Sequence, residues 1–390
     1  MTEISAHIRS KPITSTRVRV NSIILCAYLV VAFLYYLGND IMRLPLFGLV
    51  ISLSVFSFIY TKSKETSFSF KLSNILIYGC IFCFTLLIQF INSTLSVFLA
   101  MLIAGPSLAY FIFKNAFNTK LIKIPVLLFS LYFIFTYLLR GSLEVAFIQM
   151  SVNYVSVVMI MNIALVSFIE KRQGVSVSIW PALVGFFLAL LAQGRAGILV
   201  TLFLVLNVLF MHWRGLKSSI KLISAVIFIS GLVIFILSQI DTILLVIENI
   251  EFLERFSKKG VDSPSRDILK REYFSHMNTE NIILGYNYQN NHWFKHYGGN
   301  PHNSYIRLHH YFGFFFFLIV PLIIIALVRL LFRNVFICGL FFAVLLRAYT
   351  DTVLFLTLYD FMVILLFYYS FNYMKIEKEK KLYPSKVDAN

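Results

Sequence analysis

The chain has 390 residues, of which 59% are hydrophobic and only 13% are charged, and its mean hydropathy is +0.81. A soluble domain of this length cannot bury so much apolar surface in one core, so the composition excludes an ordinary soluble protein. The formal net charge is +16. The basic residues lie in short segments between apolar runs, however, which argues against nucleic acid as a partner.

Long apolar runs recur along the chain, each of about 17–25 residues, which is enough to cross a hydrocarbon core as a helix. In chain order, the predicted spans are Ser22–Leu37, Leu44–Tyr60, Leu72–Phe90, Thr94–Phe113, Leu121–Leu138, Val152–Ile169, Val177–Gln193, Ala196–Trp213, Ile220–Gln239, Tyr311–Leu331, Val335–Ala348 and Thr352–Phe371. The sequence therefore predicts an all-α integral membrane protein with about twelve transmembrane helices.

The distribution of basic residues predicts the orientation of these spans. The N-terminus, the C-terminal tail and the short loops on their side carry 22 Lys and Arg residues, whereas the short loops on the other side carry four: Arg43, Arg140, Arg195 and Arg347. Cytoplasmic segments carry such an excess. We therefore expect a basic cytoplasmic N-terminus at residues 1–21 without a cleavable signal peptide, a membrane domain at 22–371 and a cytoplasmic tail at 372–390.

One polar segment, residues 241–310, interrupts the pattern between the ninth and tenth spans and is predicted to lie outside. It holds eight Lys/Arg, eight Asp/Glu and six of the eight histidines. Loops this long are generally functional, and the aromatic content argues against disorder. Within it, Ser263-Pro264 followed by Arg266–Met277 predicts a capped helix, with Leu269, Tyr273 and Met277 on one face.

Arg195 is the first candidate functional residue. The segment Ser176–Trp213 must hold two spans, yet two full spans and a turn need roughly 40 residues or more. The turn Gln193–Gly197 is therefore expected below the outer surface, where a guanidinium needs an anion. The alternative is an arginine that reaches to lipid phosphates.

Arg266 and His302 are the other two candidates. Arg266 begins the predicted loop helix, and its alternative role is a surface salt bridge with Asp262 or Asp267, which contributes little. His302 precedes the tenth span, and a neutral imidazole at the outer interface can accept a proton. The alternatives for His302 are a hydrogen-bonded interfacial histidine and a zinc site formed with His292 and His296, which lacks the glutamate of a zincin motif.

These segments together resemble the bacterial O-antigen polymerase and O-antigen ligase superfamily. Gln193-Gly194-Arg195-Ala196 is similar to its (T/S)-x-(S/T)-R motif, although Gln193 and Gly194 replace hydroxyl residues. Arg266-Asp267-Ile268-Leu269 with Ile282–Tyr286 is similar to R-x-x-(L/M)…(I/L)-G-x-G, although Asn287 stands where a second glycine is common. Pro301–Ile306 with Gly313 is similar to H-N-x-(Y/F)-(L/I)…G.

The resemblance implies a GT-C-like fold with one large extracytoplasmic loop between helices 9 and 10. It also implies inverting, metal-independent glycosyl transfer without a cofactor, at the outer face of the cytoplasmic (inner) membrane. The donor would be an undecaprenyl-diphosphate-linked oligosaccharide. The implied catalytic residues are His302, Arg195 and Arg266, and the implied substrate-binding residues are Arg140, Asn303, Tyr305 and Arg347, with loop aromatics stacking on sugars.

Three functions remain open at this point. The aromatic, low-charge spans and the residues of the Pro301–Ile306 motif favour an O-antigen or related surface polysaccharide polymerase. A ligase that transfers the glycan to lipid A core is the first alternative, and a transporter of lipid-linked glycans is the second, although transporters generally carry charges or broken helices within several spans. Expected partners are membrane lipids, a chain-length regulator and a flippase.

Overall fold

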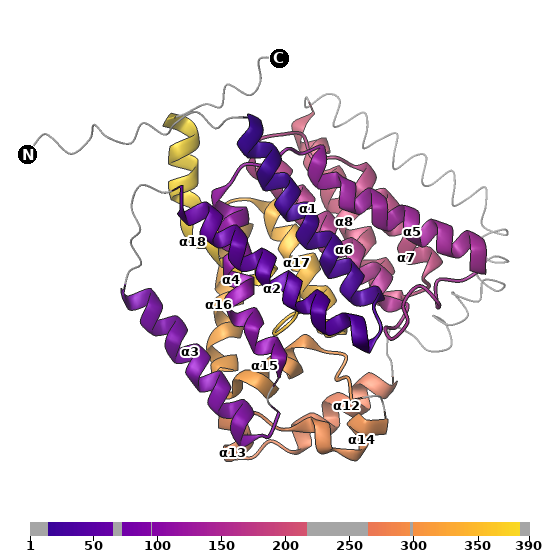
Figure 1. Ribbon diagram of the computed structural model, residues 1–390, viewed down its shortest axis with the longest axis vertical. Helices are drawn as coiled ribbons and strands as arrows, with labels where there is room; N and C mark the ends of the chain where they lie inside the picture. Colours follow the sequence, from indigo (N-terminus) through magenta and orange to yellow (C-terminus); the bar gives the residue numbers. More distant parts are fainter. Residues whose placement is uncertain (1–14, 65–71, 95, 217–263, 297–298, 383–390) are drawn as a thin grey trace, which may run out of the picture.

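The computed structural model describes residues 15–64, 72–94, 96–216, 264–296 and 299–382, which form helices and the segments that join them (Figure 1). The first group of helices is α1 (Ser15–Leu37), α2 (Asp40–Lys62), α3 (Leu72–Ile91), η1 (Val97–Ala100), α4 (Met101–Lys114), η2 (Leu121–Lys123), α5 (Ile124–Arg140), α6 (Asn153–Arg172), α7 (Trp180–Leu191) and α8 (Arg195–Gly215). The second group is α12 (Pro264–Ser275), α13 (Thr279–Leu284), η3 (Tyr288–Asn290), α14 (His292–His296), α15 (Ser304–Phe312), η4 (Gly313–Phe315), α16 (Phe316–Leu331), α17 (Val335–Thr350) and α18 (Phe361–Leu382).

Within the described residues, seven helical segments are long and apolar enough to cross a membrane. They are Ser15–Leu37, Asp40–Lys62, Val97–Lys114, Leu121–Arg140, Asn153–Arg172, Arg195–Gly215 and Ser304–Leu331. Shorter apolar helices occur at Gly79–Ile91, Trp180–Leu191, Val335–Thr350 and Phe361–Asn372. The protein is thus a multi-span helical membrane protein, and the count of twelve spans stays a prediction; the predicted span Ile220–Gln239 lies outside the described residues.

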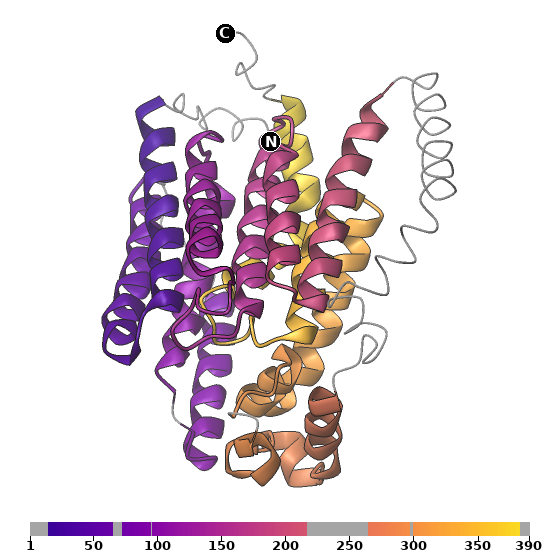
Figure 2. The same ribbon diagram turned by 90° about the vertical axis from the view of Figure 1, so that its right-hand side faces the viewer.

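The helices pack side by side, and the two ends of the bundle differ in character. The beginning of α1 and the end of α18 lie at one end, whereas α12, α13 and α14 form a layer at the other (Figures 1 and 2). At the first end, the side chains of basic residues hold neighbouring loops together. Lys123 pairs with the buried Glu170 at 2.7 Å, and Arg172 donates to the carbonyl oxygens of Phe113 and Asn115. Which end faces the cytoplasm stays a prediction from the distribution of basic residues.

Helix α6 forms the centre of the bundle. Every residue from Tyr154 to Glu170 is buried, because the helix is apolar around its whole circumference and other helices cover it. Helix α16 is much less buried than α6, since large apolar residues such as Leu322, Ile324 and Ile325 are exposed on it. An exposed apolar face of this length is expected where a helix contacts lipid.

The layer formed by α12, α13 and α14 has a small core of its own. Leu269, Tyr273, Tyr288, Phe294 and Ile306 are all buried in it. The predicted loop helix is confirmed as α12, and two of the residues predicted to share a face point into this core. The predicted capping residue, Ser263, lies outside the described residues.

Two histidines attach this layer to α15. His309 Nε2 donates to the carbonyl oxygen of Ile282 at 3.2 Å, so its Nδ1 accepts from the hydroxyl of Tyr273 at 2.7 Å. Burial raises the pKa of Tyr273, which keeps its hydroxyl available as a donor. His310 Nδ1 donates to the carbonyl oxygen of Tyr286 at 2.9 Å. Two of the six loop histidines therefore have structural roles.

Two glycines, Gly285 and Gly313, allow α13 and α15 to pack closely. Gly313 has a φ of +48°, and a Cβ atom there would lie 2.1 Å from the carbonyl oxygen of Ile283. Gly285 has a φ of +77°, and a Cβ atom there would lie 2.4 Å from the carbonyl oxygen of His309. Any side chain would separate α13 from α15, so packing by itself requires glycine at both positions.

The prediction for the last span is partly wrong. The apolar run Thr352–Phe371 predicted one helix, but α18 begins only at Phe361, and residues 351–360 form a buried, non-helical segment. Side chains satisfy its backbone: Ser304 Oγ accepts from the N–H groups of residues 353 and 354, and the Asp360 carboxylate accepts from those of residues 356 and 357. Irregular backbone is stable among apolar helices only where protein groups pair it in this way.

Candidate functional site at the end of the bundle next to the α12–α14 layer

A buried ion pair lies where α17 meets the non-helical segment. The Arg347 guanidinium is 3.2 Å from the carboxylate of Asp351, and these side chains are only 1% and 2% exposed. Arg347 also donates to Thr350 Oγ1 at 2.8 Å and to the carbonyl oxygen of Asn153 at 3.1 Å. These partners lie on different elements and hold the guanidinium in one orientation.

Asp351 connects this pair to His302. The nearest carboxylate oxygen is 3.7 Å from His302 Nδ1, a distance for charge attraction rather than a hydrogen bond, and the same oxygen accepts from the Thr352 N–H at 2.9 Å. Burial acts to raise the pKa of Asp351, but His302, Arg347 and the Thr352 N–H outweigh it and lower the pKa to about 2. Asp351 is therefore ionised at neutral pH.

The backbone at His302 is unusual. Its φ is +47°, in the left-handed region that side chains with a Cβ rarely adopt, and its imidazole is 28% exposed. Asn300 Oδ1 holds this turn, because it accepts both from the His302 N–H and from Thr352 Oγ1, each at 2.9 Å. Strained backbone that surrounding contacts enforce is common at functional sites.

Arg195 is the first residue of α8, and the packing of that helix against α6 determines its place. A Cβ atom on Gly197 would lie 2.3 Å from Ser156 Oγ, and one on Gly194 would lie 2.8 Å from Asn153 Oδ1. The start of α8 thus approaches α6 more closely than a larger residue permits. The preceding helix α7 has 12 residues and is about 18 Å long. Arg195 itself is half-buried, and the position of this turn below the outer surface stays a prediction.

Arg266 brings the α12–α14 layer into the same site. It is half-buried on α12, and burial lowers the pKa of its guanidinium. The Asp351 charge opposes this change, whereas the charges of Arg347 and Arg195 add to it. Asp351, Arg347 and Arg195 therefore lie within range of the Arg266 charge. These residues, 195, 266, 347 and 351, are far apart in the sequence, and we call them the arginine cluster; Asp351 places the cluster beside His302.

The remaining predicted site residues have other surroundings. Asn303 is buried and caps α15, since its Oδ1 accepts from the N–H groups of Tyr305 and residue 306. The Tyr305 hydroxyl donates to the carbonyl oxygen of Leu345 at 3.4 Å. Arg140 is exposed at the end of α5, beside a separate pocket of about 580 Å³. Among the described residues, no hydrogen bond, ion pair or charge effect joins Arg140 to the arginine cluster.

Few of the loop aromatics have an exposed ring face, which stacking on sugars would require. Tyr288 and Phe294 are buried in the core of the layer, where they pack with Leu269, Tyr273 and Ile306. Tyr286 is half-buried and stacks on His276 with ring centroids 4.6 Å apart. Trp293 is 41% exposed and keeps a face for a ligand. Tyr297 lies outside the described residues.

Sequence reasoning missed two residues that matter here. Asp351 follows Arg347 by four positions in an apolar stretch, a spacing that places opposite charges together on a helix and was a usable signal. Arg307 donates to the carbonyl oxygen of Leu356 at 2.9 Å and lies 5.6 Å from the ring of Phe98 and 5.5 Å from that of Tyr311. It supports the non-helical segment from the α15 side.

The described residues contain no group of three or more His, Cys, Asp and Glu side chains that could hold a metal ion. Comparison of the chain with protein-family models, with curated proteins and with solved structures finds no match.

Proposed function

We propose that this membrane protein is a polysaccharide polymerase that joins undecaprenyl-diphosphate-linked oligosaccharide repeat units at the outer face of the cytoplasmic membrane. One observation carries the proposal: Arg347 on α17 pairs with a buried carboxylate that has an accessible imidazole beside it, and Arg266 on α12 lies within range of that pair and of Arg195 on α8. Such a cationic cluster at the end of a helical bundle suits a phosphorylated substrate whose lipid tail stays in the membrane.

The arginine cluster fits a diphosphate leaving group. Guanidinium groups bind phosphate oxygens through two parallel hydrogen bonds, and they keep their charge under all physiological conditions. When the bond between the sugar and the diphosphate breaks, negative charge grows on the departing oxygens. Arg347 is buried and held by three partners, so its oriented charge would act on the diphosphate through its field without reorganising, whereas the half-buried Arg195 and Arg266 would be the donors that contact it.

His302 fits the role of general base. The acceptor hydroxyl attacks the anomeric carbon, the bond from that carbon to the diphosphate oxygen breaks, and the hydroxyl proton passes to the imidazole. The Asp351 carboxylate lies beside Nδ1, which leaves Nε2 to face the acceptor and stabilises the positive charge that the ring gains. Asp351 is then a positioning residue, and attack from the face opposite the leaving group gives inversion.

The test uses purified protein with undecaprenyl-diphosphate-linked repeat units, read as a ladder of longer glycans. The His302→Ala variant is expected to form the ladder about 10²–10⁴-fold more slowly, the usual contribution of a general base. His292→Ala is the matched control, because His292 is an exposed histidine of the same layer. Full-rate ladder formation by His302→Ala would refute the assignment.

The same assay separates the alternatives. No ladder with the natural protein, together with transfer of the glycan to lipid A core, would identify a ligase. Equal losses in His292→Ala and His302→Ala, restored by added zinc, would identify a zinc site. Movement of the lipid-linked glycan across a vesicle membrane without any new glycosidic bond would identify a transporter.

A further inference from the structure

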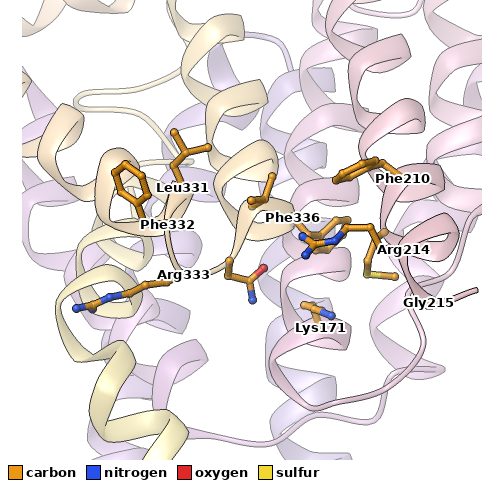
Figure 3. Close-up of a pocket in the computed structure, with 11 residues that line it drawn as sticks. Lys171, Phe210, Arg214, Gly215, Leu331, Phe332, Arg333 and Phe336 are labelled. Atoms are coloured by element: carbon orange, nitrogen blue, oxygen red, sulfur yellow. The ribbon is translucent and has the colours of Figure 1, made fainter. Parts of the chain in front are cut away.

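A second basic site lies at the opposite end of the bundle, where α6, α8 and the turn between α16 and α17 meet. A pocket of about 460 Å³ opens there. Its lining includes three basic residues and no acidic one: Lys171, Arg214 and Arg333. Figure 3 shows Lys171 and Arg214 on neighbouring sides of the hollow, with Arg333 extending away from them along the rim.

The secondary structure explains why these groups meet. Lys171 lies in the last turn of α6 and Arg214 in the last turn of α8. The partial negative charge at the ends of both helices attracts basic side chains to this place, and the full charges of Lys171 and Arg214 outweigh it. Asn334 caps α17 by accepting from the Ile337 N–H at 3.1 Å, so the positive end of α17 also faces the pocket.

The walls of the pocket continue into apolar surface. Phe332 is 83% exposed and Leu331 49% on the α16 side, while Phe210 is 42% exposed on α8. These residues line the pocket themselves, and further exposed leucines follow along α8 toward its middle. A ligand that fits this surface has an anionic head and long apolar tails.

We propose that this pocket binds the phosphate headgroup of an anionic phospholipid of the cytoplasmic leaflet, with its acyl chains along α8 and α16. The charge of the lining and its position at the ends of membrane helices favour a lipid over a soluble anion, because basic pockets between such helices bind anionic headgroups. A general excess of positive charge at the cytoplasmic end would not require a hollow with adjoining apolar walls. The proposal does not depend on the glycosyltransferase assignment.

The experiment measures phosphatidylglycerol bound to the detergent-purified full chain by native mass spectrometry. The pocket variant is Lys171→Gln/Arg214→Gln, and the matched control is Lys64→Gln/Lys120→Gln, which removes the same charge from exposed residues at the same end. Each cation near an anionic lipid contributes about fivefold to affinity, so the pocket variant is expected to bind about 30-fold more weakly. The control variant is expected to bind as the natural protein does.

Further measurements distinguish a lipid from a soluble phosphate ligand and test whether substitution at this site disturbs the fold. Lys171→Arg/Arg214→Lys keeps the charges and is expected to retain binding, which shows that the site tolerates substitution. Phosphatidylcholine and glycerol 3-phosphate are expected to compete weakly. Unchanged phosphatidylglycerol binding by the pocket variant, equal loss in the control variant, or equal binding of glycerol 3-phosphate would each overturn the proposal.

Discussion

The buried pair of Arg347 and Asp351 gives the sharpest test of the site's energetics. Both side chains are almost completely buried, so removal of one leaves the other as an uncompensated charge in a low-dielectric environment. Breaking a buried pair in this way typically costs about 3–5 kcal/mol. Arg347→Ala and Asp351→Ala are each expected to lower the free energy of unfolding by roughly this amount.

The double variant Arg347→Met/Asp351→Leu is expected to behave differently. It removes both charges and fills their volume with apolar atoms, so its stability should lie within about 1 kcal/mol of the natural protein or above it. The glycan ladder should nevertheless be lost, because the arginine cluster has lost one of its three cations and His302 has lost its carboxylate. The pair is thus predicted to serve function more than stability.

The measurement is unfolding of the detergent-solubilised protein at neutral pH, combined as a double-mutant cycle. Since the pKa of Asp351 in the folded protein is about 2 instead of 3.8, ionised Asp351 stabilises the fold at pH values above about 4. This contribution should be lost as the pH falls from about 4 to 2. A double variant that is destabilised by the sum of the two single effects would refute the reasoning.

Three other predictions follow from the same structure. The Arg195→Lys variant keeps the charge but loses the planar guanidinium, so it should make much less polymer, and Arg195→Ala should slow the reaction about 10²–10³-fold or more. Glycans of normal length in cells whose Arg195→Ala protein is correctly inserted would show that Arg195 does not belong to the site. Gly197→Ala places a methyl group against Ser156 and should cost about 1–3 kcal/mol of stability in thermal unfolding, and Ser156→Gly should restore most of it; no recovery would show that this contact is not the cause. A cysteine introduced at position 295 should react with a membrane-impermeant thiol reagent added outside the cell, and one at position 333 should react only from the cytoplasmic side. A cysteine at position 295 that the external reagent does not label would refute the predicted topology.

The apolar runs and the basic residues between them determined the class of this protein. Runs of this length can only be helices in a bilayer, because the backbone must satisfy its own hydrogen bonds there. The same local reasoning predicted α12, whose turn chemistry and apolar face lie within one short segment.

Local reasoning failed where distant residues decide the structure. The apolar run after Asp351 predicts a helix. The side chains of Ser304 and Asp360 instead accept hydrogen bonds from its backbone N–H groups, which makes a buried non-helical segment stable. Tyr288 and Phe294 were expected to be exposed and to stack on sugars, but both are buried in the core of the α12–α14 layer.

The proximity of Arg266 to Arg195 and to the Arg347–Asp351 pair is also a tertiary result. The three arginines belong to helices separated by up to about 150 positions in the chain, and no spacing within the sequence encodes their proximity. It depends on how closely α8 packs on α6 and on the attachment of the α12–α14 layer to α15 through His309 and its neighbours. Sequence supplied the residue types, whereas packing between distant helices brought the charges of Arg195 and Arg347 within reach of Arg266.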